Sequence, residues 1–86
     1  MKIIVAEARQ WDGSLAAATD LIDWILASGG TARYHDEGPS ALSIDVPAGI
    51  ATAVPGDWII MDDQGQFRPV DARAYERMTA EVPGTP

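Results

Sequence analysis

The stretch from residue 14 to residue 28 limits the fold of this chain more than any other segment. Asp12 or Ser14 can cap its first amides, and Gly29-Gly30 supply the backbone conformations that end a helix. Apolar residues fall on one side of this stretch at helical spacing; they are Leu15, Ala18, Ile22, Ile25 and Leu26. The pattern predicts one helix that lies flat on a sheet and keeps a narrow polar face.

Short strand patterns separated by turns fill most of the remaining chain. Apolar alternation or β-branched runs predict strands at residues 3–11, 31–35, 42–46, 50–54, 58–61 and 67–70. The segment from Val54 to Asp57 fits a type II turn, because Pro55 presets φ and Gly56 supplies the positive φ of the third position. Pro69 cannot donate a backbone hydrogen bond, so the last strand should be short or lie at a sheet edge.

A final helical segment is expected at the end of the chain, because Asp71 can cap a turn that runs through Met78. We therefore predict an α+β fold of order β-α-β-β-β-β-β-(short α). The sheet is expected to be twisted, mainly antiparallel and built from about five to six short strands, with the helix at 14–28 covering one face. The 86 residues suffice for one domain, placed at residues 1–82, followed by a frayed tail at 83–86.

Composition and charge narrow the classes of function. The chain has no cysteine, which excludes disulfides, thiolate zinc sites and a cysteine nucleophile. Its formal net charge of −7 repels phosphate backbones, so we expect no direct nucleic-acid binding. The acidity either keeps the protein soluble or mimics nucleic acid, and both explanations stay open. No apolar run suits a signal peptide or a membrane span, so we expect a cytoplasmic protein without a membrane partner.

Three segments carry a resemblance to a known group of proteins. They are Ala8-Arg9-Gln10-Trp11-Asp12-Gly13, Pro55-Gly56-Asp57-Trp58-Ile59-Ile60 and Gly65-Gln66-Phe67-Arg68-Pro69, with an aromatic residue following at Tyr75. Together they resemble small hypothetical proteins of phages and prophages built around "QWxG" and "PGD(W/Y)II…GEFYPCKPDIF". The resemblance covers almost the whole chain and implies a phage or prophage origin, a small stand-alone domain and a place in the bacterial host cell. Val70 stands where these proteins often have cysteine.

A few side chains are candidates for binding. Trp11 ends a predicted strand beside a turn, and together with Tyr34 or Tyr75 we expect it to be partly exposed, as aromatic anchors of interfaces are. Asp57 either bonds the backbone of its own turn or lies in a ligand-binding loop at a sheet end. His35 is the only histidine and is expected in a solvated loop.

Two functions are compatible with these features. The first is a non-catalytic binding module that acts on a host or phage protein, and a strand edge near residues 67–70 would also permit self-pairing into a homo-oligomer. The alternative is an oligomer that sequesters a small ligand such as a nucleotide signal, which requires Arg33, Arg68 and Arg73 to converge at a subunit boundary. We predict no enzymatic activity, no metal and no cofactor, because no spacing pairs His35 with a carboxylate.

Overall fold

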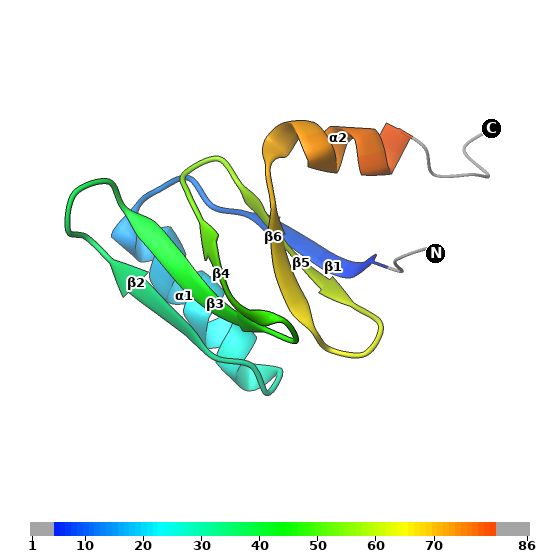
Figure 1. Cartoon of the computed structure of the whole chain (residues 1–86), viewed down its shortest axis with the longest axis horizontal. Helices are drawn as coiled ribbons and strands as arrows, with labels where there is room; N and C mark the ends of the chain where they lie inside the picture. Colours follow the sequence, from blue (N-terminus) through cyan, green and yellow to red (C-terminus); the bar gives the residue numbers. More distant parts are fainter. Residues whose placement is uncertain (1–4, 81–86) are drawn as a thin grey trace.

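The computed structural model describes residues 5–80, and it arranges them as strands and helices in the predicted order (Figure 1). The elements are β1 (Val5–Gln10), α1 (Leu15–Ala27), β2 (Ala32–His35), β3 (Ala41–Val46), β4 (Gly49–Ala53), β5 (Trp58–Asp62), β6 (Phe67–Val70) and α2 (Ala72–Ala80). The predicted α+β class and element order are confirmed. The first residues of the predicted strand at 3–11 and the predicted tail at 83–86 lie outside the described residues.

The strands divide into two antiparallel sheets, whereas the sequence pattern suggested one. The first sheet has the order β1-β5-β6 and the second has the order β2-β3-β4. The division arises because β1 pairs with β5, far along the chain, with Ala8 opposite Ile60 and Gln10 opposite Trp58. Strands β2 to β4 form a meander that pairs only with itself. β6 is a short edge strand, as Pro69 predicted.

α1 forms where its caps predicted it. The Oγ of Ser14 accepts the N–H of Ala17 at 3.1 Å, which satisfies one amide of the first turn. At the other end, the N–H of Gly30 donates to the carbonyl of Ile25 at 2.8 Å, so the last turn is closed before β2 begins. α1 packs along β2 and covers the inner face of the second sheet (Figure 1).

One hydrophobic core joins α1 to both sheets. Its buried residues are Trp11, Ala18, Leu21, Trp24, Ile25, Leu42, Ile44, Ala53, Ile59 and Phe67. The rings of Trp24 and Phe67 meet edge to face with centroids 5.0 Å apart, which ties α1 to β6. On the β1 side, the guanidinium carbon of Arg9 lies 4.5 Å from the centre of the Trp24 ring. Trp24 therefore connects α1, which packs on the second sheet, to two strands of the first sheet.

The predicted turn at residues 54–57 is confirmed, and it locks the end of β1. The N–H of Asp57 donates to the carbonyl of Val54 at 3.0 Å, and Gly56 has a φ of +95°. Trp11 bonds this turn twice, through its N–H to the Asp57 carbonyl at 3.0 Å and through its carbonyl to the Gly56 N–H at 2.8 Å. The connection from β4 to β5 is thus fixed against the connection from β1 to α1.

α2 begins at the predicted cap and extends beyond its predicted end at Met78. The Oδ1 of Asp71 accepts the N–H of Ala74 at 2.6 Å, which caps the first turn. Within residues 5–80, neither helix is long and apolar enough to cross a membrane.

Candidate functional site

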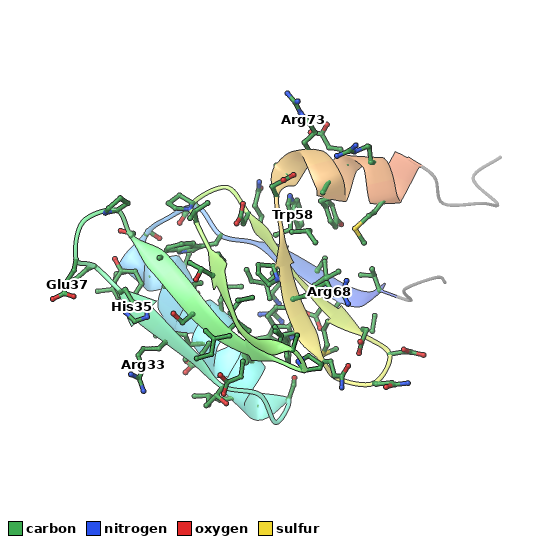
Figure 2. All side chains as sticks on the ribbon, viewed as in Figure 1. Arg33, His35, Glu37, Trp58, Arg68 and Arg73 are labelled. Carbon is green, nitrogen blue, oxygen red and sulfur yellow. The ribbon has the colours of Figure 1, made fainter. Side chains whose placement is uncertain are left out.

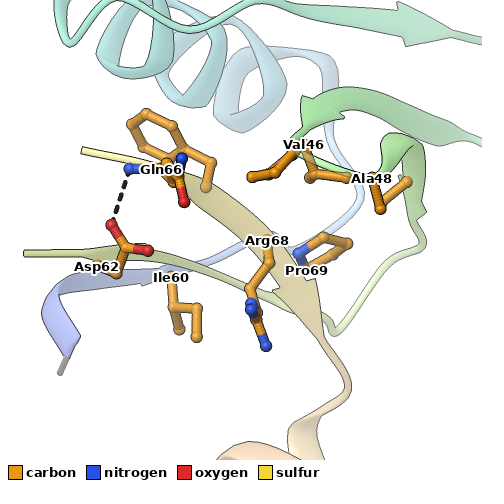
Figure 3. Close-up of a pocket in the computed structure, with 10 residues that line it drawn as sticks. Val46, Ala48, Ile60, Asp62, Gln66, Arg68 and Pro69 are labelled. Carbon is orange, nitrogen blue, oxygen red and sulfur yellow. Dashed lines mark hydrogen bonds between the residues drawn. The ribbon is translucent and has the colours of Figure 1, made fainter. Parts of the chain in front are cut away.

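The surface has a hollow of about 350 Å³ where the β3–β4 hairpin meets β5 and β6 (Figure 3). We call it the seam groove. Its apolar walls come from Val46, Ala48 and Ala51 on one side and from Ile60, Phe67 and Pro69 on the other. The groove therefore presents an apolar concave surface next to the core.

One cation lies at the seam groove. Arg68 is the exposed residue of the edge strand β6 and lies opposite Ile60 in the register of β5. In the part of the chain that the structure describes, its guanidinium forms no ion pair and no hydrogen bond. Figure 3 shows the Arg68 side chain on the same side of the β5–β6 ribbon as Ile60, pointing away from Val46 and Ala48. Its five N–H donors are available to a ligand.

The carboxylate that lines the groove, Asp62, stabilises the hairpin between β5 and β6. The Oδ1 of Asp62 accepts the N–H groups of Gln64 and Gln66, each at 2.9 Å. These bonds close the hairpin between β5 and β6 and so fix the position of Phe67 and Arg68 on the groove. The groove therefore contains two charged side chains: the Asp62 carboxylate, which holds the hairpin, and the Arg68 guanidinium.

The expectation that Trp11 is partly exposed is wrong. Its side chain is 0 % exposed, and its Nε1–H donates to the carbonyl of Ser14 at 2.9 Å. Tyr34 packs against it edge to face, with centroids 6.2 Å apart, and the Tyr34 hydroxyl lies 3.3 Å from the Oγ of Ser40. Two backbone hydrogen bonds fix Trp11 to the 54–57 turn, and the ring nitrogen bonds the start of α1. The local turn signal at Asp12-Gly13 does not predict these contacts with a distant turn.

Asp57 lies in its turn rather than in an open loop. Its Oδ2 accepts the N–H of Val54 at 3.0 Å, so the carboxylate closes the turn on itself. This contact accounts for the aspartate as a structural residue. Asp57 is not among the residues that line the seam groove.

The three arginines of the sequestering hypothesis do not converge within one chain. Arg33 stands on β2, Arg68 on β6 and Arg73 on α2. Figure 2 shows the three side chains on separate parts of the molecule, with Arg33 and Arg73 pointing away from the body on opposite sides. A single chain therefore offers no joint phosphate site built from them. Of the binding candidates Trp11, Tyr34, Asp57, Arg68 and Arg73, Arg68 alone lines the seam groove.

The outer face of the second sheet holds a polar hollow of about 280 Å³. His35 lies on β2, half-buried rather than in a loop as expected, and its Nε2 is 2.7 Å from the Oγ of Ser43. The nearby carboxylate of Asp45 accepts the hydroxyl of Thr31 at 2.8 Å. Because Asp45 is bonded to Thr31, it does not orient the imidazole as the acid of a catalytic triad does.

A ring pair on the outer face of the first sheet was missed by sequence reasoning. Trp58 is half-buried and stacks on Tyr75 of α2. The alternation of side chains along β5 indicates this position. Ile59 faces the core, so its neighbour Trp58 must point to the opposite face of the sheet. Within residues 5–80, no three histidine, aspartate or glutamate side chains gather as metal ligands would.

Comparison with known proteins gives no relative for this chain. Nothing matches it among protein-family models, curated proteins or solved structures.

Proposed function

We propose that this protein is a non-catalytic binding module that docks on another protein through the seam groove. The observation that carries the proposal is an apolar hollow whose lining includes the Arg68 guanidinium, which forms no ion pair with any residue from 5 to 80. Binding sites typically pair a mostly apolar concave surface with a small number of polar groups that fix orientation. Arg68 supplies such a group.

The groove chemistry indicates what the partner presents. A hollow of about 350 Å³ lies at the lower end of the range for ligand sites, which suits one side chain better than a whole cofactor. Arg68 can hold a carboxylate in a bidentate pair. We infer that the partner inserts an apolar side chain and places a carboxylate next to it.

The source of the partner is proposed from the sequence resemblance. The motifs at residues 8–13, 55–60 and 65–69 resemble those of phage and prophage proteins, which favours a partner of the phage or of its bacterial host. On the same basis we propose that the protein acts in the bacterial cytoplasm. The resemblance supports this choice, and the groove supports only the mode of binding.

A matched pair of variants tests the proposal. Ala48 is exposed at the rim of the seam groove, so Ala48→Trp fills the groove without disturbing the core. Ile50→Trp places the same ring on the same hairpin, at a position that does not line the groove. Affinity capture from a bacterial lysate, with or without phage infection, should yield a protein that binds the wild type and Ile50→Trp but not Ala48→Trp or Arg68→Glu. A captured set that is identical for all four proteins would refute a role for the groove.

A further inference from the structure

β1 is an edge strand of the first sheet, and one row of its backbone groups faces outward. The sheet order places β5 on one side of β1 and no described strand on the other. Pro69 has no N–H, so its pair with Ile59 carries no ladder bonds, and Ile59 therefore directs its backbone groups toward Arg9 of β1. By alternation along the strand, Ala8 and Gln10 direct their N–H and C=O groups away from β5.

Two opposite charges flank Ala8 on the face of β1 that is turned toward the core. The Oε2 of Glu7 accepts the Nε–H of Arg9 at 2.7 Å and lies 2.7 Å from its Nη2. The Trp24 ring lies under the guanidinium and helps to hold it at the strand edge. The Glu7 side chain is still 40 % exposed and that of Arg9 is 45 % exposed. Both charged groups can therefore take a further partner from beyond the edge.

The order of the charges in Glu7-Ala8-Arg9 is complementary to itself. When two copies of β1 lie antiparallel with Ala8 opposite Ala8, each Glu7 lies opposite the Arg9 of the other copy. The outward backbone groups fit the same register, because the two Ala8 residues then exchange both of their hydrogen bonds. The pairs of Glu7 with Arg9 fall at the positions between such bonds, where facing side chains lie closest. Opposite charges at these positions stabilise a strand pair, and like charges destabilise it.

We propose that β1 pairs antiparallel with β1 of a second copy of this chain, so that the two first sheets join into one sheet. Charges that point inward and the irregular register between Val5 and Glu7 are features that keep foreign strands from an edge. Here the same charges admit one strand in one register, which is a second β1. Each carboxylate then lies beside two guanidiniums, one from its own strand and one from the other copy.

The two other strand edges near the seam groove do not offer this pairing. On β6, Phe67 and Pro69 are the residues that face away from β5, and Pro69 has no N–H to donate. Self-pairing at residues 67–70 therefore lacks a donor that β1 has. Because β1 and β6 are opposite edges of the first sheet, the dimer leaves the seam groove of each copy open. The pairing stands independently of the function proposed for the groove.

Charge variants test the register by light scattering after size exclusion, over a range of protein concentrations. We expect a monomer–dimer equilibrium for the wild type, because one strand pair forms a small interface. Glu7→Arg and Arg9→Glu should each weaken the dimer at least about tenfold, since each places like charges across the two strands. The protein that carries both substitutions regains the complementary order and should dimerise as the wild type does. An equimolar mixture of the two single variants should form a heterodimer.

A proline pair tests the backbone contact. Ala8→Pro removes the outward N–H and keeps the bonds from β1 to β5, so we expect a folded monomer. The control is Ala32→Pro on β2, another edge strand. The carbonyl of Thr31 accepts the N–H of Asp45, so the N–H of Ala32 points away from β3 and its loss should leave the dimer unchanged. Circular dichroism checks that both variants fold, and this pair decides the question if a charge variant does not.

Three results would overturn the proposal. One is a wild type that stays monomeric at its highest soluble concentration, and another is a dimer of unchanged strength in folded Ala8→Pro. The third is unchanged dimerisation of both single charge variants, which would place the contact outside β1. Ala48→Trp alters the seam groove and leaves β1 intact, so a loss of partner capture in that variant with an intact dimer separates the two proposals.

Discussion

The rings of Trp58 and Tyr75 lie parallel, with centroids 4.0 Å apart and an angle of 9° between their planes. This stack joins β5 to α2 on the face of the first sheet that is turned away from the core. Because α2 follows the edge strand β6 directly, the stack also fixes the end of the strand that carries Arg68. It links the last helix to the seam groove.

The stack should contribute measurably to stability. We expect Trp58→Ala and Tyr75→Ala each to destabilise the protein, with a coupling free energy of about 0.5–1.5 kcal/mol in a double-mutant cycle. Urea unfolding of the four proteins measures this coupling. The control cycle combines Trp58→Ala with Arg73→Ala on the exposed side of α2 and should be additive. Equal coupling in the two cycles would mean that the stack does not hold α2.

Arg9 should stabilise the fold through the ring beneath it. Its guanidinium lies 4.5 Å from the Trp24 centroid and is held there by Glu7, whose Oε2 is 2.7 Å from the Arg9 Nη2. We expect Arg9→Ala to cost about 1 kcal/mol in urea unfolding and Arg9→Lys to cost less, since lysine keeps the charge. Arg33→Ala, on an exposed face, should stay within about 0.5 kcal/mol. Equal losses for Arg9→Ala and Arg33→Ala would contradict a specific contact with Trp24.

Two glycines with similar backbone angles should differ in their tolerance of alanine. Gly13 has a φ of +92°, and a Cβ there would lie 2.9 Å from the Cβ of Pro55. Gly56 has a φ of +95°, but a Cβ there meets nothing within 4 Å. Both alanine variants incur the backbone cost of about 1–3 kcal/mol, and Gly13→Ala adds a clash of at least about 1 kcal/mol. Chemical denaturation compares them directly, and indistinguishable midpoints would contradict the close approach of residues 13 and 55.

Asp12 should make stability depend on pH in the acid range. The Ser14 N–H donates to its Oδ1 at 2.8 Å, and this bond, followed by one from the Ser14 hydroxyl, holds the pKa of Asp12 below its ordinary value. A lowered folded-state pKa stabilises the protein above the unfolded-state pKa, and this contribution is lost as pH falls through the folded-state pKa. We expect the stability difference between wild type and Asp12→Asn to be full at neutral pH and to shrink below about pH 4. A difference that stays constant between pH 7 and pH 2 would contradict this account.

Local signals in the sequence predicted the elements well. Ser14 and the Gly29-Gly30 pair bound α1, and Pro55-Gly56 marked the turn before β5. These features depend on neighbouring residues, so that propensity and hydrogen-bonding capacity are enough to find them. Pro69 likewise predicted an edge strand, because a missing N–H is a local property.

Features that depend on distant pairing were not predictable in the same way. The choice of β5 as partner of β1 divides the strands into two sheets, and no local pattern records it. The burial of Trp11 follows from its bonds to a turn more than forty residues along the chain. The seam groove is formed by residues from 46–51 and 60–69 across the junction of the two sheets. The position of Arg68 at the groove therefore depends on the tertiary fold and not on its neighbours in the sequence.

Binding of a matched peptide pair to the seam groove tests the central proposal most directly. The probes are short blocked peptides that contain Leu-Asp or the isosteric Leu-Asn, titrated into the full chain and followed by amide chemical shifts. We expect shifts centred on Ala51, Phe67 and Arg68, and at least about threefold tighter binding of Leu-Asp that disappears in Arg68→Gln. Equal binding of the two peptides, or shifts centred outside the groove, would contradict the assignment of the groove and its arginine as the binding site.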